Sequence, residues 1–308
     1  MDLRELGSSG LQVSVVGIGC NNFGTRIDER QVADVVRAAL EAGITHFDTA
    51  ESYGGGESEA FLGKALGGLR DQAVIATKFA PRPREESYRP GVLRRRILEG
   101  CDGSLKRLGT DRIDLYYQHR PDPEAPAEEA LEALGELVAA GKVVQVACSN
   151  FSAGQVDEAS RISAAAGPPA FVASQIHWNL LFREEEEAHI PAARRHGMGI
   201  IPYFPLESGL LTGKYRPDDY PEGSRLTKAP RFGELATEEN FAYIERLTRF
   251  AEERGHSLLD LAFGWLLAQD GVGSVIAGAT TPEQVAQNAQ AGQEWRLSAG
   301  DLAALPEK

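Results

Sequence analysis

The feature of this chain that most limits its fold is a regular alternation of short apolar runs with segments of helical periodicity. Eight runs rich in β-branched residues recur along the 308 residues, at 15–19, 44–48, 73–78, 113–118, 143–148, 171–176, 199–204 and 272–277. Segments with the apolar spacing of helices follow at 30–42, 58–66, 91–108, 126–140, 155–164, 184–195, 241–254 and 282–291. Such apolar strands, alternating with helices, predict a parallel sheet covered by helices.

Eight such units predict an α/β fold of the (β/α)8 barrel type, formed by one domain over residues 1–308. About 250 residues is typical of that fold. The surplus is an expected N-terminal β-hairpin around Gly7 to Gly10, a long loop at 207–235 after the seventh strand, and extra C-terminal helices, one of them at 258–268. The alternative, a doubly wound open sheet in two domains, would need the glycine pattern GxGxxG after the first strand, which Val16 to Asn21 does not fit.

Charge and cysteine usage narrow the class of partner. The 32 basic and 45 acidic residues give a net charge of −13, which disfavours nucleic acid or an anionic membrane as the main partner. The N-terminal residues have no apolar stretch typical of a signal peptide and no apolar run is long enough to span a membrane, so we expect neither; three scattered cysteines without a CxxC pair are typical of reduced thiols. We therefore expect a cytoplasmic protein that acts on a small molecule.

Side chains that can donate or accept a proton lie at or just after the ends of three neighbouring predicted strands. Asp48 ends the second predicted strand, and Tyr53 follows it in a glycine-rich turn; Lys78 ends the third strand, and His119 lies just past the fourth. Each alone has an ordinary structural explanation, such as a cap, a rim residue or an ion pair. Because the carboxyl ends of barrel strands meet at one face, the four together predict a proton-transfer site.

The chemistry of this set is specific. A lysine ammonium beside a phenol favours the phenolate and is expected to lower the pKa of Tyr53 from about 10 toward neutrality, while Asp48 keeps Lys78 charged. Such a tyrosine can donate a proton to an oxygen that becomes an alkoxide. His119 would then orient a carbonyl oxygen toward it.

The motifs around these residues resemble those of the aldo-keto reductases. The chain has FDTAESYGGGESEAFLGKAL, ATKF and DLYYQHRPDP at the corresponding places, and VACSNFS, SQIHWNLL, PYFPLESGLLTGKY and VIAGATTPEQVAQN follow in the family's order. The resemblance covers essentially the whole chain and is nearest to the bacterial and potassium-channel-associated branches. It implies Tyr53 as general acid, Lys78 and Asp48 as the pair that tunes it, and His119 as the group that orients the carbonyl.

The resemblance also implies a nicotinamide cofactor, NADPH being favoured and NADH not excluded. Ser149, Asn150 and Gln175 would hold the carboxamide, and Tyr203 would stack on the nicotinamide. Gln284 and Gly278 stand where better-known reductases have an arginine and a lysine for the 2′-phosphate, an arrangement similar to branches that still use NADP. The implied cofactor-binding residues are Gly19, Cys20, Asn21, Asp48, Ser149, Asn150, Gln175, Tyr203, Phe204, Pro205, Leu206, Ser208, Gly209, Leu211, Lys214, Arg225, Ile276, Gly278, Thr280, Gln284, Gln287 and Asn288.

The sequence specifies the substrate pocket less closely than the cofactor site. The expected lining residues lie in loops above the nicotinamide: Asn22, Phe23, Tyr53, Tyr88, His119, Trp178 and Phe232. Few residues follow Leu297, where mammalian steroid and sugar reductases have a long loop that narrows the pocket, so we expect an open pocket.

The function predicted is NADPH-dependent reduction of an aldehyde or ketone to an alcohol. One alternative is an NADP-binding redox-sensing or regulatory protein with little turnover. Another is a barrel lyase that uses Lys78 as a Schiff-base amine. A metal hydrolase is disfavoured, and no metal is expected, because the six histidines include no HxH or HExxH pair.

Overall fold

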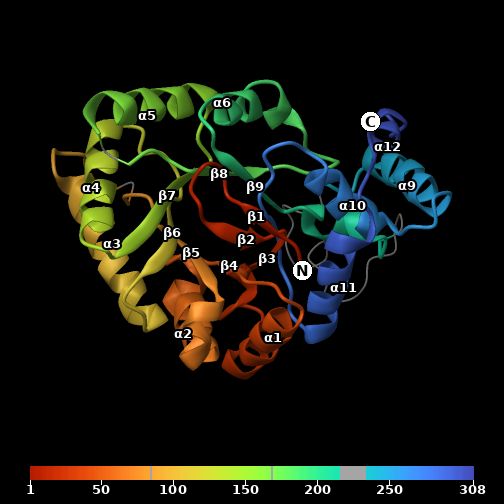
Figure 1. The fold of residues 1–308 in the computed structure, drawn as a ribbon, viewed down its shortest axis with the longest axis horizontal. Helices are drawn as coiled ribbons and strands as arrows, with labels where there is room; N and C mark the ends of the chain where they lie inside the picture. Colours follow the sequence, from red (N-terminus) through yellow and green to blue (C-terminus); the bar gives the residue numbers. More distant parts are fainter. Residues whose placement is uncertain (84, 168, 216–233) are drawn as a thin grey trace.

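The computed structural model describes residues 1–83, 85–167, 169–215 and 234–308 of the chain. Eight strands form one sheet in the order β10-β3-β4-β5-β6-β7-β8-β9, and all neighbouring pairs are parallel. They are β3 (Val16–Gly19), β4 (His46–Asp48), β5 (Val74–Phe79), β6 (Ile113–Gln118), β7 (Val143–Ser149), β8 (Ala173–His177), β9 (Gly199–Tyr203) and β10 (Val275–Ala277). A parallel bridge between Ile200 and Val272 joins the two edges, so the sheet curves into a nearly closed barrel (Figure 1). The predicted (β/α)8 barrel is confirmed.

Helices cover the outside of the barrel (Figure 1). They are α1 (Glu29–Glu41), α2 (Glu57–Leu66), α3 (Val92–Leu108), α4 (Ala127–Ala139), α5 (Ala153–Ala166), α6 (His189–Arg195), α9 (Glu238–Glu252), α10 (Leu258–Leu267), α11 (Pro282–Glu294) and α12 (Ala299–Ala303). Most strand residues are buried on both faces, as all six residues of β6 are, although Val144 of β7 is exposed. Within the described part of the chain, no helix is long and apolar enough to cross a membrane.

The helix predicted at 184–195 is wrong in its first half. A short 3-10 turn, η4 (Glu184–Glu186), comes first, and α6 begins only at His189. Pro191 explains the break, because proline lacks an N–H and its ring clashes with the carbonyl four residues earlier, so it is tolerated only in the first turn of a helix. Likewise, the long segment after β9 begins with a 3-10 helix, η5 (Glu207–Thr212), rather than with an open loop.

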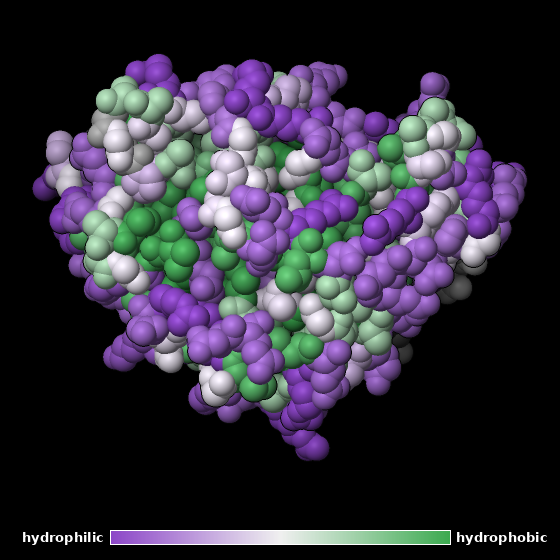
Figure 2. Space-filling model, in the orientation of Figure 1, coloured by the Kyte–Doolittle hydropathy of each residue, from purple (hydrophilic) through white to green (hydrophobic). Residues whose placement is uncertain are grey.

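Polar and apolar residues are distributed unevenly on the surface. Figure 2 shows mostly hydrophilic residues along the outline of the molecule, and hydrophobic residues visible between hydrophilic ones near the middle of this face. A largely hydrophilic rim agrees with the net charge of −13.

The predicted N-terminal hairpin is present and packs against the barrel. Strands β1 (Leu3–Glu5) and β2 (Gln12–Ser14) pair antiparallel, and Leu6 is fully buried in the same apolar cluster as the inward-facing residues Leu115 and Ile201. Gly7, at a φ of +58°, lies so close to the chain that a Cβ there would meet the Val172 carbonyl oxygen at 2.5 Å. The hairpin therefore closes the barrel interior through backbone contact.

This contact predicts unequal effects at two glycines of the same turn. Gly7→Ala should lower the free energy of unfolding by about 2 to 5 kcal/mol, because a left-handed conformation costs a side chain about 1 to 2 kcal/mol and overpacking adds about 1 to 3 kcal/mol. Gly10→Ala is the matched control: its φ is +75°, but nothing lies within 4 Å of a Cβ there. Urea unfolding of both variants measures the difference. Equal losses would contradict the close packing at Gly7.

Candidate active site

The barrel brings the four predicted proton-transfer residues to one end. Asp48 is the last residue of β4, Lys78 is the penultimate residue of β5, and His119 follows β6 directly. Tyr53 begins a 3-10 turn, η2 (Tyr53–Gly56), whose three glycines all have positive φ and so let the chain turn tightly before α2. Four side chains from three neighbouring βα units therefore meet at the carboxyl ends of the strands.

A buried ion pair lies at the centre of this cluster. Lys78 Nζ donates to Asp48 Oδ1 at 2.5 Å and to the Thr49 carbonyl oxygen at 2.8 Å, and Gln175 Nε2 donates to Asp48 Oδ2 at 2.7 Å. The Lys78 side chain is fully buried. Burial is the largest single effect on the pKa of Lys78 and lowers it, but the charge and hydrogen bond of Asp48 together with Tyr53 raise it by more, so the net pKa is raised. Lys78 therefore remains an ammonium at neutral pH.

Tyr53 lies beside this ammonium, with its ring centroid 5.3 Å from Lys78 Nζ. The expectation that Lys78 lowers the pKa of Tyr53 toward neutrality is not met in the protein alone. Burial raises the pKa of the phenol, and the nearby ammonium offsets only part of that effect. Tyr53 is consequently protonated at neutral pH, which is the state that a proton donor requires.

His119 faces Tyr53, with the two ring centroids 6.0 Å apart at an interplanar angle of 80°. Burial, with smaller contributions from Lys78 and Arg120, lowers the pKa of His119 to about 3. Its backbone is held by Asn150, whose Nδ2 donates to the His119 carbonyl oxygen at 3.0 Å. A neutral imidazole is thus fixed opposite the phenol.

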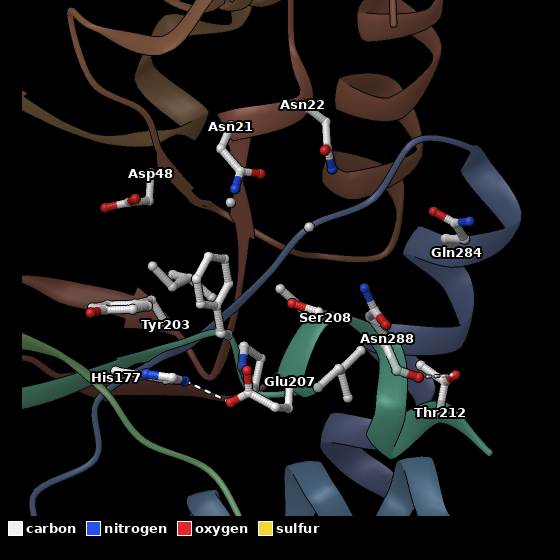
Figure 3. A pocket seen from close by; sticks show the side chains of 18 of the residues that line it. Asn21, Asn22, Asp48, His177, Tyr203, Glu207, Ser208, Thr212, Gln284 and Asn288 are labelled. Atoms are coloured by element: carbon white, nitrogen blue, oxygen red, sulfur yellow. Dashed lines mark hydrogen bonds and ion pairs between the residues drawn. The ribbon is translucent and has the colours of Figure 1, made fainter. Parts of the chain in front are cut away.

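A cavity of about 1060 Å³ opens over these residues. Asp48, Tyr53 and His119 line it, together with most of the predicted cofactor-binding residues: Gly19, Asn21, Ser149, Asn150, Gln175, Tyr203, Phe204, Pro205, Leu206, Ser208, Gly209, Lys214, Ile276, Gly278, Thr280, Gln284, Gln287 and Asn288. Figure 3 shows Asp48 and Tyr203 toward one end of the pocket and Gln284 and Asn288 toward the other. Cys20 and Leu211 are instead fully buried and do not line it. Arg225 lies outside the described residues.

Unusual backbone conformations are concentrated in this pocket. Among the described residues, the non-glycine positions with positive φ are Asn150, Phe204, Glu207 and Ser208, and all four line the cavity. Such conformations cost of order 1 to 3 kcal/mol each and persist where the surrounding structure holds them, often at ligand sites. Here Asn179 holds the segment by donating to the Phe204 carbonyl oxygen at 2.9 Å and to Glu207 Oε2 at 2.5 Å.

Two polar atoms of the lining are buried without a partner among the described residues: Ser208 Oγ and Asn288 Nδ2. Buried polar atoms are nearly always hydrogen-bonded, so an orphaned pair in one pocket is what a missing polar ligand would leave. Nearby, Thr280, Gln284 and Gln287 line this end of the cavity around the N-terminus of α11, where a phosphate is favoured. These residues fit a nucleotide.

Comparison with known proteins agrees with this geometry. The sequence model of the aldo/keto reductase family matches residues 15–308. The chain belongs to the aldo/keto reductase family. It is 36% identical over 293 residues to the aldo-keto reductase YhdN of Bacillus subtilis, covering 92% of this chain and 87% of that protein. The family assignment makes this chain an oxidoreductase of carbonyl compounds.

Two further relatives are named for other roles. The chain is 37% identical over 300 residues to a putative voltage-gated potassium channel subunit beta of Schizosaccharomyces pombe, covering 94% of this chain and 87% of that protein. It is 32% identical over 320 residues to the L-glyceraldehyde 3-phosphate reductase of Escherichia coli strain K12, covering 100% of this chain and 92% of that protein.

Only some of the residues predicted to contact substrate line the pocket. Asn22, Tyr53 and His119 line the pocket, whereas Phe23 and Trp178 are fully buried elsewhere. Trp178 packs edge-on against Trp265 and donates its indole N–H to Glu186. The Tyr88 hydroxyl donates to Glu129 Oε2 at 2.7 Å, away from the pocket. Phe232 lies outside the described residues.

Sequence reasoning missed several lining residues of this aldo/keto reductase. His177 could have been predicted, because residues two apart on a strand share a face and Gln175 was already predicted to face the pocket. Its Nε2 lies 2.6 Å from Glu207 Oε2 (Figure 3). Arg120 directly follows His119 and could have been included. Leu259 and Asp260 enter only through the packing of α10, which no local pattern reveals.

The environment of His119 predicts its protonation state. With a pKa of about 3, the ring is neutral throughout the physiological range, since a base is neutral above its pKa. In NMR spectra of histidine-labelled protein, the His119 Cε1–Hε1 signal, assigned by its loss in His119→Gln, should not titrate between pH 5 and 8. An inflection near pH 6.5 would contradict the burial described for this ring.

Proposed function

We propose that this aldo/keto reductase reduces an aldehyde or ketone to an alcohol with NADPH, using Tyr53 as the general acid. The observation that carries the proposal is the cluster at the pocket floor. A protonated phenol and a neutral imidazole line the cavity beside a fully buried Lys78–Asp48 pair. This is the set of groups that would place and protonate a carbonyl oxygen.

Each residue has a defined task in this proposal. His119 hydrogen-bonds the carbonyl oxygen and directs it toward the Tyr53 hydroxyl. Tyr53 gives its proton to that oxygen as it becomes an alkoxide, and the adjacent Lys78 ammonium stabilises the phenolate that remains. Asp48 keeps Lys78 charged and in place. The Schiff-base alternative is disfavoured because the Lys78 amine is held by two hydrogen bonds and kept protonated, which removes its nucleophilic lone pair.

The cofactor in this proposal is NADPH, which supplies the hydride when it is bound. Ser149, Asn150 and Gln175 would hold the carboxamide, because amide and hydroxyl groups offer both donors and acceptors. Tyr203, whose hydroxyl donates to Asn150 Oδ1 at 2.9 Å, would present its ring to the nicotinamide. Ser208 and Lys214 would face the diphosphate, and Asn288 would face the adenine.

Preference for NADPH over NADH rests on the end of the pocket near α11. Gln284 Oε1 accepts from the Thr280 N–H at 2.8 Å and from its hydroxyl at 3.1 Å. The acceptor of this amide is therefore engaged, and its NH2 group remains to donate to a phosphate oxygen. An amide donor in place of an arginine supports a weaker 2′-phosphate contact than the better-known reductases have.

The role of Tyr53 has a direct test. Tyr53→Phe should lower kcat by about 100-fold or more, the usual contribution of a positioned acid, while NADPH binding is retained. Tyr88→Phe removes the same hydroxyl outside the pocket and serves as the matched control. Steady-state reduction of 4-nitrobenzaldehyde and fluorescence titration with NADPH measure the two properties. If Tyr53→Phe kept most of the turnover with cofactor bound, Tyr53 would not be the acid.

A second candidate is a redox-sensing or regulatory role with little turnover. It is favoured by the relative in Schizosaccharomyces pombe that is named as a channel subunit. Turnover separates the two: a sensor would bind NADPH and reduce aldehydes negligibly.

A further inference from the structure

The charged side chains that line the pocket differ in whether they have partners within the protein. Its acidic side chains all have partners within the protein: Asp48 accepts from Lys78, Glu207 accepts from Asn179, and Asp260 accepts from the Ser257 backbone N–H at 2.8 Å. The basic lining residues are Arg26, Arg120 and Lys214. The carboxylates of the pocket are therefore hydrogen-bonded within the protein, and the lining holds as many basic as acidic side chains although the whole chain carries −13.

Arg120 is the basic residue nearest in sequence to the proposed chemistry. It is exposed, and within the described part of the chain it forms neither an ion pair nor a side-chain hydrogen bond. Arg82, outside the pocket lining, is engaged instead: it binds Asp122 Oδ2 at 2.9 Å and also contacts Glu124 in the loop that follows Arg120. The carboxylates of that loop are thus taken by Arg82.

The position of Arg120 places its charge at the reacting end of the pocket. Asn150 fixes the carbonyl just before it and also accepts from the Tyr203 hydroxyl, so these residues form one hydrogen-bonded rim. The charge of Arg120 contributes to lowering the pKa of His119 and opposes the burial that raises the pKa of Tyr203. Glu184 and Glu185 line a separate cavity of about 460 Å³ rather than this pocket.

We infer that Arg120 is a specificity-determining residue that selects carbonyl substrates bearing an oxyanion, a carboxylate or a phosphate, beyond the carbonyl carbon. The inference rests on the proposed reductase function. A guanidinium offers a planar fork of donors that matches either oxyanion bidentately. A protein with a net charge of −13 repels anions at long range, so a local cation at the mouth is what would admit them.

A pair of aldehydes that differ in one charge tests this inference. 4-Carboxybenzaldehyde and methyl 4-formylbenzoate share a ring and a carbonyl, but only the first is anionic. We expect the wild-type protein to favour the carboxylate. In Arg120→Gln, the ratio of the two kcat/KM values should fall about 5-fold or more, mainly through KM of the carboxylate, since the contact is made before and during reaction alike.

Three comparisons make the result specific. Arg161→Gln removes the same charge from an exposed position on α5 that is outside the pocket, and should leave the ratio unchanged. Arg120→Lys keeps the charge without the fork and should give an intermediate ratio. Raising KCl to 0.5 M should shrink the wild-type preference, because salt screens exposed charges.

Binding without turnover separates the inference from the proposed function. Calorimetric titration with 4-carboxybenzyl alcohol in the presence of NADP+ should show binding to the wild type that weakens in Arg120→Gln. An unchanged ratio, or equal affinity in both proteins, would overturn the role of Arg120. If neither aldehyde were reduced but the alcohol bound through Arg120, the reductase proposal would fail and the oxyanion site would stand.

Discussion

The Lys78–Asp48 ion pair is the interaction on which the rest of the site depends. Two opposite charges, 2.5 Å apart and almost fully buried, have lost most of their hydration, which costs several kcal/mol per ion. The pair is tolerable because the Thr49 carbonyl and the Gln175 amide add one further hydrogen bond to each ion. A buried pair of this kind is weak support for stability. We interpret it instead as the means of keeping an ammonium beside Tyr53.

The barrel explains how such a pair can be built. Asp48 and Lys78 come from adjacent strands, and Gln175 reaches Asp48 from β8 across the barrel interior. Because strand ends are fixed by the sheet, the donors and acceptors are held without help from the long loops. The segment after β9 then adds the strained residues Phe204, Glu207 and Ser208, which form part of the wall of the pocket.

Much of this arrangement could be predicted from local sequence. Eight apolar runs and their helices gave the barrel because strand and helix periodicities are local properties, and the order of Asp48, Tyr53, Lys78 and His119 along the strand ends followed from it. Pro191 was a readable break that helical periodicity alone overlooked. What escaped depended on tertiary packing: Trp178 and Phe23 look like pocket residues in sequence but are buried in the core. The direction of the Tyr53 pKa shift was also predicted wrongly, because burial of the phenol outweighs the charge of Lys78.

The central claim is that this pocket binds NADPH and passes its reducing equivalents to a carbonyl compound. The most direct measurement is a fluorescence titration of the wild-type protein with NADPH and, separately, NADH, followed by addition of 4-nitrobenzaldehyde to the same sample. We predict that NADPH binds more tightly than NADH and is oxidised, with one equivalent consumed for each alcohol formed. Absence of binding by either nucleotide would contradict the cofactor site, and tight binding without oxidation across a panel of aldehydes would contradict the reductase.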